Sequence, residues 1–135
     1  MTPNTSEQWL DVAKERANDA QAIHKNRPNS IGAIYMAGYG IECSLKALLQ
    51  HRGTGFPKHG SEGHNLRGLW AACKFRLSDL SDAKGSKTFF IENWDTSLRY
   101  ESKFESSLEI TDLVEGAKQL TGWIQTQIRR TRRRK

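Results

Sequence analysis

Apolar and small residues recur every three or four positions over the first part of the chain, with one short interruption. This spacing predicts a helix over residues 5–24 and a second helix over residues 31–50. Between them, residues 26–29 contain Pro28, which disfavours helical backbone at the preceding position. Thr5 and Gln8 are spaced as a capping box at the start of the first helix, and Ser30 is a good N-cap for the second. The short break favours an antiparallel helical hairpin.

The second predicted helix has two apolar stripes instead of one. The first is a normal core face of mostly large side chains: Ile34, Gly38, Ile41, Leu45, Leu48 and Leu49. The second consists of small residues: Ala33, Ala37, Gly40, Ser44 and Ala47. Small residues let another helix backbone approach closely, and the alanine row of the first helix is the natural partner. A helix that is apolar over so much of its circumference is predicted to lie at the centre of a bundle.

The rest of the chain alternates between polar or glycine-rich segments and further helical patterns. Residues 51–63 are rich in glycine and predict a loop. A third helix is predicted from about Asn65, with an apolar side formed by Leu66, Leu69, Trp70, Cys73, Leu77 and Leu80. A short helix is predicted over residues 88–93 and a long last helix from about Thr111, whereas residues 94–107 are ambiguous. Because no alternating pattern indicates a sheet, the predicted fold class is all-α, an up-and-down bundle of four to five helices.

The composition fits a single globular domain. The chain has 135 residues, a length that is enough to bury a core without disulfides. Of these residues 36% are hydrophobic and 27% charged, as is typical of a globular protein. No apolar run approaches the ~20 residues of a membrane span, and residues 1–7 do not resemble a signal peptide. We therefore expect a cytoplasmic protein with no membrane partner, in which Cys43 and Cys73 are reduced core residues.

The net charge of +6 is concentrated at the C-terminal end. Six cations lie in the last seven positions: Arg129, Arg130, Arg132, Arg133, Arg134 and Lys135. We therefore divide the chain into a bundle over residues 1–128, which is nearly neutral, and a basic tail over residues 129–135. The tail is either a solvated terminus or an arm that binds phosphates of RNA or DNA, and an acidic protein would also suit it.

One candidate polar cluster lies at the edge of the second helix. Glu42 and Lys46 have the favourable order and spacing of a helical ion pair, and Tyr35 and Tyr39 share their strip. This pattern fits a stabilising pair covered by two tyrosines. Alternatively, it fits a functional polar cluster formed by Glu42, Lys46, His64, Arg99 and Tyr100. A charged pair at the edge of a core needs partners that offset its desolvation, which those last three residues could supply.

Other familiar chemistry is not indicated. The histidines and cysteines do not have zinc-ligand spacing, so we expect no metal site. The glycines of residues 53–63 lack the strand–loop–helix context and the following Lys-Ser/Thr of a phosphate-binding loop, and no serine lies in a nucleophile elbow. We expect no cofactor.

Three blocks in a fixed order give the sequence a family resemblance. They are the helix segment over residues 37–49 with Gly40-Ile41-Glu42 before Leu45-Lys46-Ala47, then Gly63-His64-Asn65-Leu66, and finally Leu98-Arg99-Tyr100. Together the blocks resemble the HEPN superfamily of small helical domains. The resemblance implies a dimeric helical bundle that works in prokaryotic toxin–antitoxin pairs, beside a nucleotidyltransferase, or in anti-phage defence.

Many HEPN domains are metal-independent ribonucleases that place an Arg and a His on one helix with four to six residues between them. This sequence departs from that pattern. Arg52 and His59 have the spacing, but glycines and Pro57 interrupt any helix between them, and no histidine follows Arg99. We therefore expect a non-catalytic or accessory domain that binds RNA, a nucleotide or a partner protein. The alternatives are an endoribonuclease, with Arg52, His59, His64 and Arg99 as candidate catalytic residues, and a structural adaptor.

Overall fold

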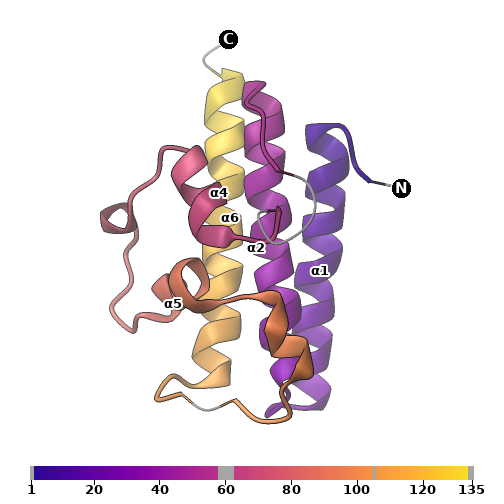
Figure 1. Cartoon of the computed structure of the whole chain (residues 1–135), viewed down its shortest axis with the longest axis vertical. Coiled ribbons are helices and arrows are strands. Elements are labelled where there is room, and N and C mark those ends of the chain that lie inside the picture. Colours follow the sequence, from indigo (N-terminus) through magenta and orange to yellow (C-terminus); the bar gives the residue numbers. More distant parts are fainter. Residues whose placement is uncertain (1, 58–62, 105, 134–135) are drawn as a thin grey trace.

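The structure is a computed structural model that describes residues 2–57, 63–104 and 106–133, without the side chains of Arg99 and of residues 131–133. Over these ranges the chain forms five α-helices and no strand, so the predicted all-α class is confirmed (Figure 1). The helices are α1 (Ser6–Asn26), α2 (Ile31–Arg52), α4 (Leu66–Ala72), α5 (Ser86–Asn93) and α6 (Ile110–Arg133). Two 3₁₀ turns, η1 (Leu77–Asp79) and η2 (Thr96–Tyr100), lie in the connections.

The first two helices begin at side-chain caps, as their sequences predict. The Thr5 hydroxyl accepts a hydrogen bond from the Gln8 amide at 3.1 Å, and the Ser30 hydroxyl accepts one from the Gly32 amide at 3.1 Å. Helix α2 ends where Gly53 adopts a left-handed conformation with φ of 71°. Such a residue commonly ends a helix because glycine reaches this conformation without strain.

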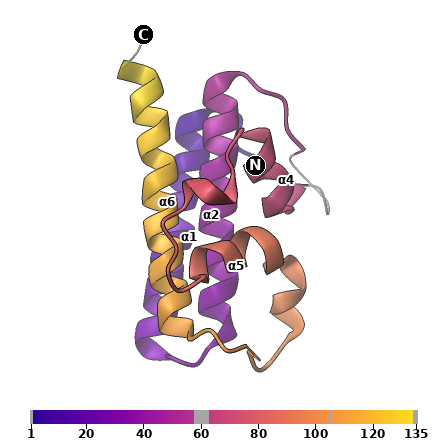
Figure 2. The ribbon, with the colours of Figure 1, turned by 90° about the vertical axis from the view of Figure 1, so that its left-hand side faces the viewer.

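Helix α2 is the centre of the bundle. It runs antiparallel to α1 and packs against α6 on another side, while α4 and α5 cover one flank of the long helices (Figures 1 and 2). The small-residue stripe faces α1: a Cβ added to Gly40 would lie 3.4 Å from the Ala13 carbonyl oxygen and 3.7 Å from the Ala17 Cβ. The predicted hairpin and its close contact are therefore present.

The core face of α2 holds an aromatic contact that the helical periodicity did not predict. The Trp94 ring lies directly against Gly38, where an added Cβ would come within 2.0 Å of ring atoms. The indole Nε1 of Trp94 also donates a hydrogen bond to the Ile34 carbonyl at 3.2 Å. A glycine is therefore required at position 38, because a side chain there would overlap the Trp94 ring. This contact holds the segment before η2 against α2.

The predicted length of the third helix is wrong, because α4 ends at Ala72. Leu77 lies instead in the η1 turn and is 38% exposed, and Leu80 follows that turn. The stop is a Schellman motif: Lys74 takes a left-handed φ of 65°, its amide donates to the Ala71 carbonyl, and the Phe75 amide donates to the Trp70 carbonyl. The rings of Phe75 and Trp70 pack at 4.8 Å, which supplies the hydrophobic contact of this motif.

Helix α6 extends beyond the C-terminal boundary predicted for the bundle. Its backbone stays helical through Arg133, beyond the boundary expected at residue 128. The division between a bundle and a tail therefore stays a prediction. Among the described helices, not one combines the length and the apolar character needed to cross a membrane.

Candidate functional site

A charged pair lies inside the bundle on α2. The Nζ atom of Lys46 is 3.0 Å from Oε2 of Glu42, and the two side chains are 1% and 3% exposed. Two buried charges are costly unless each has partners that replace water. The pair therefore needs further contacts from outside α2.

His64 supplies one such contact from the short turn before α4. Its Nδ1 atom lies 2.8 Å from Oε1 of Glu42, so both carboxylate oxygens of Glu42 are engaged. A carboxylate paired with a lysine ammonium only accepts hydrogen bonds, so Nδ1 of His64 is the donor. The imidazole is thereby held in one orientation, with 32% of the side chain exposed.

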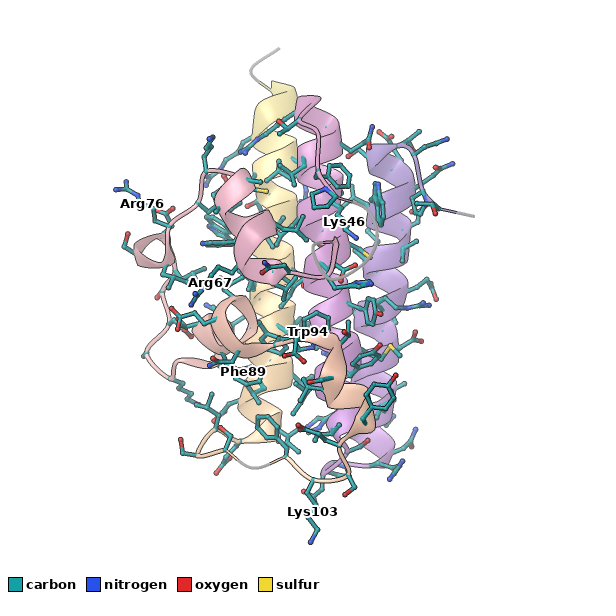
Figure 3. All side chains as sticks on the ribbon, in the orientation of Figure 1. Lys46, Arg67, Arg76, Phe89, Trp94 and Lys103 are labelled. Carbon is teal, nitrogen blue, oxygen red and sulfur yellow. The ribbon has the colours of Figure 1, made fainter. Side chains whose placement is uncertain are left out.

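Aromatic rings enclose this cluster. The rings of Tyr39 and His64 meet edge to face at 5.8 Å, and the Tyr35 hydroxyl donates to the Tyr39 hydroxyl at 3.1 Å. On the α1 side, Nζ of Lys46 lies 5.0 Å from the centre of the Trp9 ring, a cation–π distance. Figure 3 shows Lys46 inside the bundle, whereas Arg76 and Lys103 point away from it.

A groove of about 500 Å³ opens beside the cluster, between α1 and α2. Aromatic, sulfur-containing and charged side chains line it: Trp9, Val12, Arg16, Tyr35, Met36, Tyr39, Glu42, Cys43, Lys46 and His64, together with Thr2 and Pro3. The indole Nε1 of Trp9 is buried and has no hydrogen-bond partner among the described residues. The groove therefore combines apolar walls, an orphan donor and charged groups.

Cys43 lines the groove but is a poor nucleophile. Burial and, to a smaller extent, the nearby Glu42 carboxylate raise the pKa of its thiol to about 12, against the opposing effects of Lys46 and Arg16. The reactive form of cysteine is the thiolate, which is scarce at neutral pH when the pKa is this high. Covalent chemistry at Cys43 is therefore disfavoured.

Arg52 lies away from this cluster. It follows Glu42 by ten residues on the same helix, so the two positions are about 15 Å apart along the axis. Its Nη1 donates a 2.6 Å hydrogen bond to the Cys73 carbonyl, and its guanidinium lies over the Phe75 ring at 5.6 Å. Arg52 thus joins the end of α2 to the end of α4 and does not meet His64.

Several of the predicted residues are placed only in part. His59 lies outside the described residues, as does the side chain of Arg99, whose backbone is in η2. Tyr100 is 78% exposed and does not line the groove. In the basic tail, the side chains of Arg129 and Arg130 are exposed, and those of Arg132, Arg133, Arg134 and Lys135 lie outside the described part.

The contribution of α1 to the site was missed by sequence reasoning. Trp9 and Arg16 are seven residues apart, two helical turns, and therefore lie on one face of α1. That spacing could have marked them as neighbours, but nothing local shows that this face meets Glu42. Among the described residues, no three His, Cys, Asp or Glu side chains are placed to hold a metal ion.

Comparison with known proteins supports one family. A family model described as "HEPN domain" matches residues 6–127, nearly the whole chain, and confirms the resemblance drawn from the three sequence blocks. No curated protein and no solved structure matches the chain.

Proposed function

The chain belongs to the HEPN domain family, and we propose that it is a non-catalytic member whose groove beside Glu42, Lys46 and His64 binds a nucleotide. The observation that carries this proposal is an aromatic groove whose lining includes an internally satisfied charged cluster. Charges that are satisfied by one another hold the site in shape, and Trp9, Tyr39 and Arg16 line the groove beside them.

The size and lining of the groove suit a small ligand. Small-molecule sites typically measure ≈ 300–1,000 Å³ and combine apolar or aromatic walls with a few polar groups. A volume of about 500 Å³ lies within that range. A base would pack against the aromatic walls of the groove. A phosphate would compete with Asp19 for the guanidinium of Arg16, whose side chain is 39% exposed and whose Nε lies 3.0 Å from Oδ2 of Asp19.

The placement of Arg52 supports binding without RNA cleavage. General acid–base cleavage needs a histidine within hydrogen-bond reach of the reacting groups, together with a cation that stabilises the developing charge. Arg52 is bonded to the Cys73 carbonyl, about 15 Å along α2 from the level of His64. The Arg–His arrangement typical of catalytic relatives is therefore not formed by Arg52 and His64.

Thermal melting with added ATP, ADP and AMP tests the binding proposal. A ligand that binds only the folded chain raises Tm with increasing concentration. We expect such a rise for the wild type. Arg16→Gln should weaken the apparent affinity about tenfold, since hydrogen bonds to charged groups contribute ~1.5–3 kcal/mol. Arg67→Gln, an exposed arginine outside the groove, is the control and should bind like the wild type. Equal shifts in the wild type and Arg16→Gln would contradict this site.

One observation favours a second function, a metal-independent endoribonuclease. Glu42 and His64 form a carboxylate–imidazole pair with a 2.8 Å contact, and such a carboxylate orients a histidine for proton transfer. This alternative predicts cleavage of RNA in EDTA by the wild type and loss of cleavage in His64→Ala. Our proposal predicts full-length RNA with both proteins.

The context of the protein is a separate part of the proposal. As in other HEPN domains, we expect a cytoplasmic homodimer that acts in a toxin–antitoxin or defence setting, with a nucleotidyltransferase as one possible protein partner. Light scattering on the purified chain tests the dimer. A monomeric mass at micromolar concentration would overturn that expectation without affecting the nucleotide test.

A further inference from the structure

The C-terminal end of the bundle carries a second aromatic cluster, separate from the groove. The rings of Phe75 and Trp123 meet at 4.8 Å, and both pack on Trp70, at 4.8 and 5.7 Å. Trp70 is 3% exposed, whereas Phe75 and Trp123 are only partly buried. The cluster thus rests on the core through Trp70 and offers two rings at the surface.

Local backbone geometry places Phe75 at this position. The left-handed Lys74 stops α4 and turns the chain, so that Phe75 folds back on Trp70 and against α6. Lys74 is not a glycine, and this conformation is uncommon for other residues. The turn therefore holds Phe75 beside Trp123 in a defined arrangement.

Two arginines lie at the same end of the bundle as the two rings. The guanidinium of Arg52 lies over Phe75, and its Nη1 donates to the Cys73 carbonyl. A guanidinium carries five N–H donors in all. Arg130 follows Trp123 by seven residues and therefore lies on the same face of α6, about 10 Å further along the axis. Helix α6 and the C-terminal end of α2 reach the same end of the bundle (Figures 1 and 2). The sequence then continues with further arginines.

From this juxtaposition we propose that Phe75, Trp123, Arg52 and Arg130 form a binding surface for single-stranded nucleic acid, with bases on the two rings and phosphates on the arginines. We call these four residues the aromatic–basic surface. Proteins that bind single strands without sequence preference combine stacking rings with a positively charged path for the backbone. A paired duplex conceals the faces of its bases, so it could use only the arginines. The proposal is independent of the nucleotide groove, since the two sites share no residue.

Fluorescence anisotropy with a labelled oligouridine RNA of about twelve nucleotides, in EDTA and over a range of salt, tests the surface. Trp123→Leu and Phe75→Leu keep an apolar side chain for the core but remove a ring. Each should weaken binding by about five- to a hundredfold, the range expected for loss of one stacked base, with an unchanged salt slope. Arg130→Gln should instead reduce the salt slope by about one, as expected for loss of one phosphate contact.

Matched controls separate stacking from general effects. Tyr100→Leu removes an exposed ring in η2, and Arg67→Gln removes an exposed arginine; both should bind like the wild type. Bound RNA should also quench tryptophan fluorescence in the wild type and much less in Trp123→Leu. If Trp123→Leu does not fold, the affinity of Phe75→Leu for the same RNA tests the stacking of bases.

Three results would overturn the proposal. They are wild-type affinity in both ring variants, equal loss in Tyr100→Leu, and equal affinity for a duplex of the same length. Competition by unlabelled single-stranded DNA then identifies the ligand more closely. If DNA displaces the labelled RNA as well as unlabelled RNA does, the surface contacts bases and phosphates alone. If DNA displaces it only weakly, the surface prefers RNA.

Discussion

Helix α2 places two cations over aromatic rings, and the two pairs lie in different surroundings. Lys46 lies 5.0 Å from the Trp9 ring centre and is 1% exposed, whereas Arg52 lies 5.6 Å from the Phe75 ring centre at the exposed end of the helix. The buried cation has a carboxylate partner in Glu42. The exposed cation donates to the Cys73 carbonyl, a neutral group.

The difference shows how burial changes the role of a charge. A buried ammonium must be compensated where it lies, so Lys46, Glu42 and His64 fix one another and shape the groove. An exposed guanidinium keeps its hydration and some of its donors, so Arg52 can still bind an anion. The first pair is therefore expected to matter for stability, and the second for binding.

The largest expected effect comes from breaking the buried pair. Lys46→Met removes the ammonium and leaves Glu42 in the core, which should lower the free energy of unfolding by about 3–5 kcal/mol. Urea denaturation measures this loss. A loss below about 1 kcal/mol would show that water or another group compensates Glu42.

A double variant sharpens the same point. Glu42→Leu combined with Lys46→Met replaces both charges by apolar side chains, which is often neutral when the volume is similar. His64 is partly exposed, so its side chain can hydrogen-bond with water in place of Glu42. We expect the double variant to be more stable than the sum of the two single variants by about 0.5–3 kcal/mol, the range for residues in contact. Additive losses in a urea double-mutant cycle would contradict the coupling.

A smaller effect is expected at the exposed pair. Arg52→Met removes one hydrogen bond, worth about 0.5–1.5 kcal/mol, and one exposed cation–π contact, worth about 0.5–1 kcal/mol. The free energy of unfolding should therefore fall by about 1–2.5 kcal/mol, measured beside Lys46→Met in the same buffer. A loss as large as that of Lys46→Met would erase the distinction between the two pairs.

The two cysteines should show the smallest effect. Burial raises the pKa of the thiol of Cys43, near the buried pair, and of Cys73, near the exposed pair, to about 12 in each case. Both thiols should therefore resist labelling by a thiol reagent at pH 8 until the chain is unfolded. Their contribution to stability is complete below the ordinary thiol pKa of 9.0 and is lost as the pH rises toward 12. Fast labelling of either native thiol at pH 8 would show that it is accessible.

The sequence predicted what is local and periodic. The caps Thr5 and Ser30, the two stripes of α2 and the spacing of Glu42 and Lys46 follow from helical geometry within one segment. The family resemblance also depends on local blocks, and the match over residues 6–127 confirms it.

Apart from the hypothesis that joined His64 to Glu42 and Lys46, contacts between distant segments were beyond such reasoning. Nothing in the residues around Trp94 shows that its ring sits on Gly38, and nothing around Arg52 shows that it caps the end of α4 at the Cys73 carbonyl. The end of α4 was misjudged because Leu77 and Leu80 continue the helical spacing, although Lys74 turns the chain before them. Periodicity records which residues share a face, but not which face it meets.

The central claim is that this HEPN domain is non-catalytic and binds RNA without cleaving it. The most direct test incubates the wild-type protein with labelled single-stranded RNA in EDTA and measures both the anisotropy and the length of the RNA. The account predicts a lasting rise in anisotropy with RNA that keeps its full length. Shortened RNA that is absent with His64→Ala would contradict it and would make the Glu42–His64 pair a catalytic one.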